Sequence, residues 1–250
     1  MLAIDRHAWT NRWHRRHPGE KLLLASGLLL ISITLPPLTT GPVVFVFMAV
    51  ATIAGAGVPV SAFLRFIAVP GAFLLSSVPL LAVSLDISGG VRLAWSLPGL
   101  ETAQQVVMRS MGAISCLAFL ALTTPLIDLA PFLRRLGVPQ VIVEIMLLTY
   151  RLLFVFMERA VSGWRAQAAR QGYAGFARSL HSLSLLIANL LQRSLGRARC
   201  IETGLAARGF EGELRVLTPE RLLSPVRLAT IAGVLLAVGV TGILLDRLPP

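Results

Sequence analysis

The sequence predicts an all-α integral membrane protein with about five transmembrane helices and a cytoplasmic insert of long helices. Hydrophobic residue types make up 55% of the 250 residues, and the mean hydropathy is +0.76. Several apolar runs reach the ~20 residues that cross a bilayer. The net charge of +11 comes from basic residues that border these runs, as in membrane proteins oriented by charge. This composition excludes intrinsic disorder and argues against a soluble α/β enzyme.

Five apolar segments are predicted to span the bilayer. They run from about Leu22 to Pro37, Val43 to Leu64, Ala68 to Leu85, Val106 to Leu126, and Leu228 to Leu245. Because basic residues favour the cytoplasmic side, the Arg-rich amino terminus is predicted to be cytoplasmic. The loops at residues 36–42 and 86–101 are then external. The basic charge is explained by this orientation in a bacterial cytoplasmic membrane, so no nucleic-acid partner is expected.

A sixth apolar stretch, residues 141–157, contains Glu144 and Arg151 and continues into a polar helical pattern. If it crossed the membrane, eleven arginines between residues 159 and 227 would lie outside. If it lies at the inner face, all of them stay inside, as the positive-inside rule favours. The interpretation has three regions. Residues 1–130 hold an interfacial segment and four spans, residues 131–224 form the cytoplasmic insert, and residues 225–250 hold the last span and an external carboxyl terminus.

Two long helical patterns occupy most of the insert. The first runs from about Gln140 to Arg170, and the second from about Leu180 to Arg208. In the second pattern, apolar residues recur at steps of three and four, which makes one stripe along a helix. The stripe comprises Leu183, Ile187, Leu190, Leu191, Ala198, Ile201 and Leu205. A stripe of this length needs a partner.

Both helical patterns end in the same way, in Ala169-Arg170-Gln171 before Gly172 and in Ala207-Arg208-Gly209. One interpretation is ordinary helix termination, because a cation in the last turn and a following Gly suit a helix end. The other is docking: alanines make a thin tip that enters a groove, where the Arg fork reaches acidic side chains or carbonyls. Two matched endings favour docking into two similar grooves.

At these residues the sequence resembles the transmembrane T component of energy-coupling factor (ECF) transporters, and most closely the CbiQ-type subunit of cobalt uptake systems. The resemblance covers nearly the whole chain. Three further features carry it: residues 13–23 before the first span, the segment Leu133–Pro139, and Tyr150-Arg151. The two Arg-bearing tips match the family's two X-Arg-X coupling motifs. The first tip departs slightly, with Gln171 where the second tip has Gly209, which leaves its capping geometry open.

The resemblance implies that the two long helices are coupling helices whose tips, Ala169-Arg170-Gln171 and Ala207-Arg208-Gly209, dock into two ABC-type ATPase subunits. It also implies a separate, cobalt-binding membrane subunit that contacts apolar surfaces within residues 141–157 and 183–195. The chain itself is then a non-catalytic subunit. In keeping with this, the sequence has no Walker-type phosphate loop and no clustered Ser, His and acid set.

Other sites are weakly indicated. His14 and His17 are three residues apart, but no acidic or thiol ligand lies near them in the sequence, so neither a metal site nor a cofactor is expected. Glu144 and Arg151 lie two helical turns apart on one side of a helix. They are candidates for pairing with each other or for contact with another subunit, or for snorkelling at the interface. The alternative functions are a T component for nickel or a vitamin, a scaffold protein, and a lipid-acting membrane enzyme.

Overall fold

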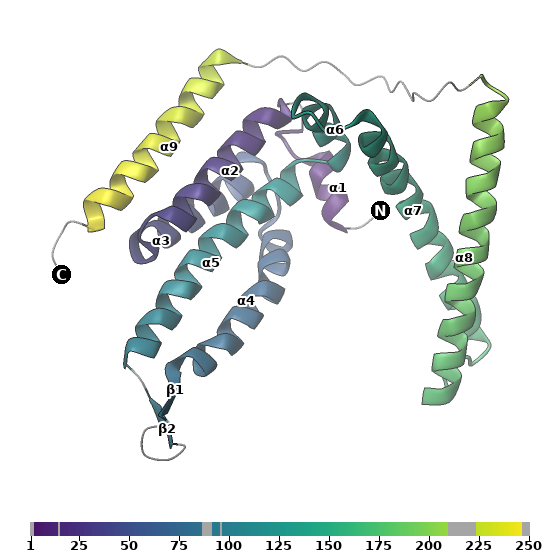
Figure 1. The fold of residues 1–250 in the computed structure, drawn as a ribbon, viewed down its shortest axis with the longest axis horizontal. Helices are drawn as coiled ribbons and strands as arrows, with labels where there is room; N and C mark the ends of the chain where they lie inside the picture. Colours follow the sequence, from purple (N-terminus) through teal and green to yellow (C-terminus); the bar gives the residue numbers. More distant parts are fainter. Residues whose placement is uncertain (1–2, 15, 87–91, 96, 210–223, 247–250) are drawn as a thin grey trace. The chain divides into compact units, whose positions relative to one another are not determined.

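A computed structural model describes residues 3–14, 16–86, 92–95, 97–209 and 224–246. The helices, shown in Figure 1, are α1 (Ala3–Thr10), α2 (Pro18–Thr34), α3 (Pro37–Val50), the π-helix η1 (Ala51–Gly55), α4 (Val60–Ala82), α5 (Leu97–Thr123), α6 (Leu126–Arg135), α7 (Gln140–Ala169), α8 (Phe176–Ala206) and α9 (Pro225–Asp246). Strands β1 (Val83–Asp86) and β2 (Arg92–Trp95) form a short antiparallel hairpin. The predicted all-α class is confirmed, and this hairpin is the one departure within the described residues.

The chain forms two compact units. The first, here called the membrane unit, comprises Met1–Leu129 and Pro219–Pro250, and the second, the hairpin unit, comprises Ala130–Thr218. The predicted insert, residues 131–224, begins beside the first residue of the hairpin unit. Residues 210–223 of the predicted insert lie outside the described part of the chain, as do residues 247–250 of the predicted external terminus.

Helix α5 is central to the membrane unit. It contacts α1, α2, α3 and α4, and α9 packs against α2 and α3. The core lies where α2, α3 and α5 meet, and Leu28, Met48 and Phe119 are completely buried there. A second apolar cluster joins α4 to α5 through Phe63 and Leu122. This arrangement accounts for the burial of α5, whose most apolar window is 39% buried, against 6% in α4.

Small residues allow α3 and α5 to approach closely. A Cβ atom added to Gly41 of α3 would overlap the main-chain carbonyl of Met108 in α5. A Cβ atom added to Gly112 of α5 would lie 2.6 Å from the Ser32 hydroxyl and 3.2 Å from the Gly41 carbonyl. Membrane helices pack through such small residues because lipid supplies no hydrophobic drive between helices.

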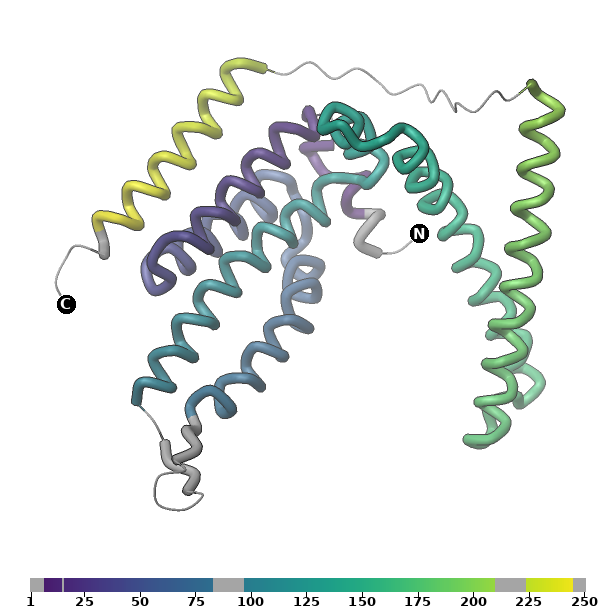
Figure 2. The backbone as a smooth tube through the Cα atoms, viewed as in Figure 1, coloured from purple at the N-terminus to yellow at the C-terminus, as the bar shows by residue number. Residues whose placement is uncertain are grey.

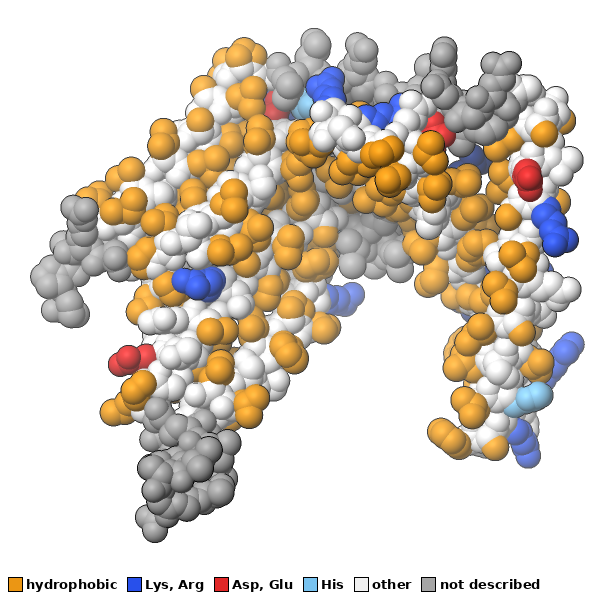
Figure 3. Space-filling view, viewed as in Figure 1, with side chains coloured by type: hydrophobic (Ala, Val, Ile, Leu, Met, Phe, Trp, Pro, Cys, Tyr) orange, Lys and Arg blue, Asp and Glu red, His pale blue; other side chains and the backbone are white. Residues whose placement is uncertain are grey.

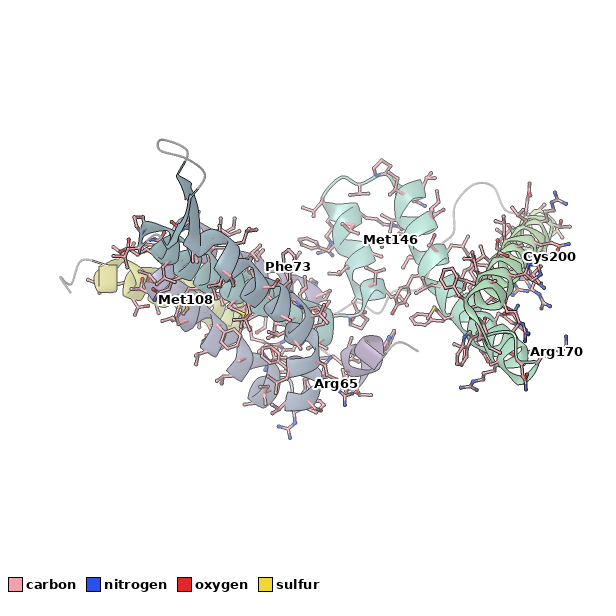
Figure 4. The ribbon with its side chains drawn as sticks, turned by 90° about the horizontal axis from the view of Figure 1, so that it is seen from below. Arg65, Phe73, Met108, Met146, Arg170 and Cys200 are labelled. Atoms are coloured by element: carbon pink, nitrogen blue, oxygen red, sulfur yellow. The ribbon has the colours of Figure 1, made fainter. Side chains whose placement is uncertain are left out.

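Long apolar side chains cover the outer surface of the membrane unit, as Figure 3 shows on one face. Phe73 of α4, labelled in Figure 4, is 73% exposed, and Leu80 is 80% exposed. In water such a surface would be strongly unfavourable, whereas in a bilayer it meets lipid chains. The exposed apolar surface and the long apolar helices together are those of a multi-pass membrane protein.

Five helical segments in the described residues are long and apolar enough to cross a membrane. They are Pro37–Gly55, Val60–Ala82, Leu97–Thr123, Gln140–Ala169 and Pro225–Leu244. This set differs from the prediction, since it includes the doubtful helix α7 and omits α2. Helix α2 has 17 residues, the short end of the range for a spanning helix, and it packs between α5 and α9 in the same bundle.

The predicted limits of the second and third spans are wrong. The sequence pattern places one helix across Val43–Leu64, but the chain leaves the helix at Gly55 and turns through Gly57, which has φ +73°. Pro59 then precedes α4, which contains Arg65. The segment Gly55-Ala-Gly-Val-Pro59 is a turn signal. The prediction missed this turn because the segment lies within an apolar run. Likewise, α5 begins at Leu97, within the predicted loop 86–101, and α3 begins at Pro37.

The amino-terminal segment closes one end of the bundle. Its helix α1 contacts α5, and Asn11 Nδ2 donates to the Thr123 carbonyl at 3.1 Å. Lys21 Nζ donates to the same carbonyl at 2.8 Å. Trp13 packs edge-on against Phe119, with ring centroids 5.7 Å apart. These contacts satisfy a carbonyl at the end of α5 that the helix itself leaves without a donor.

We expect Gly41→Ala to lower the thermal unfolding midpoint of the detergent-purified protein. The added methyl group meets main-chain atoms of α5, which cannot rotate away, and overpacking of this kind costs about 1–3 kcal/mol. Gly233→Ala in α9 is the matched control, because nothing lies within 4 Å of a Cβ atom at that position. An equal loss of stability in both variants would contradict the proposed close packing of α3 on α5.

Candidate functional site

Helices α7 and α8 form the body of the hairpin unit and are joined by the turn at residues 170–175, as the tube in Figure 2 shows. A Cβ atom at Gly163 of α7 would lie 2.7 Å from Leu186 Cδ1 of α8, so the missing side chain permits this close approach. Beside the turn, the Ser182 hydroxyl donates to the Gly172 carbonyl at 2.9 Å. The turn is therefore held to the first residues of α8.

The first tip is closed by Gln171, whose φ of +56° lies in the left-handed region. Its N–H donates to the Ala168 carbonyl at 3.0 Å, and the Gly172 N–H donates to the Gln167 carbonyl at 2.9 Å. This pair of hydrogen bonds is the Schellman arrangement, which satisfies carbonyls at a helix end. Arg170 is the last residue before the chain reverses.

The second tip shares the left-handed residue and the first of these two hydrogen bonds. Gly209 has φ +69°, and its N–H donates to the Ala206 carbonyl at 3.1 Å. In both tips a left-handed residue directly follows the Arg, so Gln171 takes the conformation that Gly209 takes without strain. The question that the sequence left open at Gln171 is thus answered: Gln171 and Gly209 have corresponding positions.

All six tip residues are exposed, and the two arginines lie at opposite ends of α8. Figure 4 labels Arg170 at the edge of the hairpin unit. Arg208 lies beyond the other end of α8, a helix of 31 residues, which corresponds to about 45 Å. The structure therefore does not bring Arg170 and Arg208 together. It presents them as two separate contacts.

The apolar stripe of α8 is divided between two faces. Leu190, Ile201 and Leu205 are half-buried, whereas Leu183, Ile187 and Leu191 are 46%, 58% and 59% exposed. An apolar surface also remains on α7, where Val141, Ile142 and Ile145 are exposed.

Glu144 has partners other than Arg151. It is 8% exposed, accepts a hydrogen bond from Gln140 Nε2 at 2.8 Å, and lies 3.8 Å from Arg134 of α6. Arg151 is exposed on α7. The charge of Glu144 is therefore placed to hold α6 against the start of α7.

His14 and His17 have local roles. His17 caps α2, with its Nδ1 atom accepting from the Gly19 N–H at 3.0 Å, and His14 lies beside the Trp9 ring. Within the described residues, no three His, Cys, Asp or Glu side chains gather as metal ligands would.

One charged cluster was missed by the sequence analysis. Glu20, at the start of α2, lies 3.2 Å from Arg227 at the start of α9 and also accepts from the Ser224 N–H at 3.2 Å. The sequence contained a signal for this pair. Glu20 and Arg227 have opposite charges, and each lies beside a predicted span on the same predicted side of the membrane, where they can form an ion pair. The spacing of 207 residues between the partners hid it.

The chain matches a family model and several known proteins that are described as cobalt transport proteins. The family model described as CbiQ, cobalt transport protein, matches residues 10–219. The chain is 40% identical over 245 residues to cobalt transport protein CbiQ of Rhodobacter capsulatus, covering 98% of this chain and 99% of that protein. It is 28% identical over 231 residues to cobalt transport protein CbiQ of Salmonella typhimurium, covering 86% and 100%. It is 31% identical over 127 residues to a putative fused cobalt transport protein CbiMQ of Methanocorpusculum labreanum, covering 51% and 21%.

Because Gln171 has a left-handed conformation, we expect substitution of glutamine by glycine to change amide hydrogen exchange in opposite directions at Gln171 and at Gln192. Gln171→Gly should slow amide hydrogen exchange in the turn at residues 170–175, because it relieves about 1 kcal/mol of backbone strain. Gln192→Gly, in the middle of α8, should speed exchange around it, because Gly costs about 1 kcal/mol in a helix. Faster exchange at the turn in Gln171→Gly would contradict the Schellman geometry.

Proposed function

The chain belongs to the CbiQ family of cobalt transport proteins and is a membrane component of such a transporter; we propose that it is the coupling subunit of an ATP-driven, ECF-type uptake system. The observation that carries this proposal is the pair of exposed tips, each with an Arg before a left-handed residue. The shared geometry argues that each tip is built for one kind of contact. Ordinary helix termination does not require the same residue and turn twice.

Each tip is suited to a groove in an ATPase subunit. Ala169 and Ala207 keep the helix ends thin, and a guanidinium group binds carboxylates or carbonyls through a planar fork of donors. The length of α8, about 45 Å, separates the two arginines. A pair of ATPase subunits side by side would receive one tip each. ATP hydrolysis is then a property of these partners, and the chain itself is non-catalytic.

A second partner is proposed on the apolar surfaces of α7 and α8. Leu183, Ile187 and Leu191 are exposed, as are apolar side chains at the start of α7, and a membrane subunit that holds the metal would cover them. The fused relative, of which this chain matches only 21%, supports a second cobalt transport component close to this one. Arg151 is the candidate polar contact in this interface, and Glu144 stabilises α7 behind it.

Cobalt is favoured over nickel or a vitamin because the family and the relatives named above are described by cobalt. A lipid-acting enzyme is the weaker alternative, since the sequence offers no nucleophile and base set.

The proposed membrane placement puts the amino terminus, α7 and α8 on the cytoplasmic side of a bacterial inner membrane. Helix α2 then crosses the bilayer with α5 and α9, against which it packs. Helix α7 lies at the inner face, which keeps the four arginines of α8 inside, as the positive-inside rule favours. These are Arg178, Arg193, Arg197 and Arg199.

The double variant Arg170→Ala and Arg208→Ala should lose co-purification with the ATPase subunits and lose cobalt uptake. Each buried charged contact is worth ~2–5 kcal/mol on truncation. The matched control is Arg178→Ala with Arg199→Ala, which removes two exposed arginines of α8 away from the tips. Normal ATPase association and uptake in the tip variant, with the chain folded, would refute the coupling role.

The placement of α8 has a native reporter. Cys200 is exposed on α8, and Cys116 is buried in α5. A membrane-impermeant maleimide should leave Cys200 unmodified in spheroplasts and modify it once the membrane is opened. Leu38→Cys in a Cys200→Ser background should be modified in both cases, because residues 36–42 are placed outside. Labelling of Cys200 from the outside would mean that α7 crosses the membrane.

A further inference from the structure

A cavity of about 150 Å³ lies between the starts of α2 and α9. Three cationic side chains line it, Arg16, Lys21 and Arg227, and one carboxylate, Glu20. All four come from the membrane unit, and the contact between Glu20 and Arg227 fixes the two helix starts at one end of the bundle. The polar part of the cavity therefore lies where the apolar lengths of two spanning helices begin.

The polar part carries more positive than negative charge. Glu20 is 3% exposed, and its two oxygens are used by the Ser224 N–H and by Arg227. Burial lowers the pKa of Arg16, as does repulsion from Arg227, while Glu20 acts in the opposite direction. Among the described residues that line the cavity, three are cationic and one is a carboxylate, and an anion between Arg16 and Arg227 would relieve their repulsion.

The remaining wall is apolar. Leu24 follows Glu20 by one turn of α2, and Ile231 and Val234 follow Arg227 by one and two turns of α9. Cations therefore meet a hydrocarbon surface that continues along both helices into the apolar part of the bundle. A free inorganic anion would use the cations alone. A lipid would use both parts, with its phosphate at the cations and an acyl chain along the wall.

We propose that this cavity binds the phosphate group of an anionic membrane lipid, held by Arg16 and Arg227 with its acyl chain against Leu24 and Ile231. The Arg16 guanidinium is already placed, with its central carbon 4.0 Å from the centre of the Trp13 ring. Lys21 contributes charge while its Nζ atom donates to the Thr123 carbonyl. This site is independent of the coupling tips, which lie in the other unit.

The test is native mass spectrometry of the full chain in detergent, titrated with phosphatidylglycerol or phosphatidylcholine. The wild-type chain should retain one phosphatidylglycerol in preference to phosphatidylcholine. Arg16→Gln should weaken this binding roughly ten-fold, since a charged hydrogen bond is lost. Arg65→Gln is the matched control, because it removes one exposed arginine of α4 near a helix start and should leave binding unchanged. Val234→Phe, which fills the apolar part without a change of charge, should also weaken binding.

Three results would overturn the proposal. The first is equal retention of the two lipids, and the second is wild-type affinity in both Arg16→Gln and Val234→Phe. The third is displacement of phosphatidylglycerol by millimolar inorganic phosphate, which would assign the cavity to a free anion. The melting temperature of each variant is measured alongside, so that a loss of binding with an unchanged melting temperature reports on the site.

Discussion

The energetic cost of a charge in the hydrocarbon core of a bilayer governs this structure. That cost is at least several kcal/mol for an arginine, so charges collect at helix ends and in segments outside the membrane. In the membrane unit the consequence is the ion pair between the buried Glu20 and the more exposed Arg227, which joins the first turns of α2 and α9. In the hairpin unit it is the set of exposed arginines along α8. The membrane unit thus pairs the charges at the starts of α2 and α9, whereas the arginines of α8 are exposed.

The exposed apolar side chains of α7 and α8 would be energetically costly in water, and the proposed contacts with other subunits would account for them. The apolar surface of α7 and α8 and the two arginine tips have little use in a single chain, yet both suit contacts with other proteins. Each kind of surface indicates a different neighbour. The tips offer charge on a thin profile, which suits a polar groove, and the helix faces offer aliphatic side chains, which suit a membrane protein. The proposed coupling role would use both surfaces, and both lie in the hairpin unit.

The helices and the tips could be predicted from the sequence, because hydropathy and turn residues are local signals. Helix α7 was expected at about 140–170 and is observed at Gln140–Ala169. The end of α3 was missed because Gly55 and Gly57 lie within an apolar run, and apolar content does not distinguish a turn from a span. The ion pair of Glu144 with Arg134 was missed because it depends on how α6 folds against the start of α7. The capping role of Gln171 was not predictable, since a non-glycine residue rarely takes a left-handed φ and only the backbone reveals it.

The close approach of Gly163 to Leu186 lies nearer to one tip of the helical pair than to the other. Arg170 follows Gly163 by seven residues, and Arg208 follows Leu186 by twenty-two. At the rise of an α-helix, the distances from the contact to the two arginines are about 10 Å and about 33 Å. The Arg170 tip therefore lies close to the contact between the two helices, and the Arg208 tip lies about three times as far from it along the helix axis.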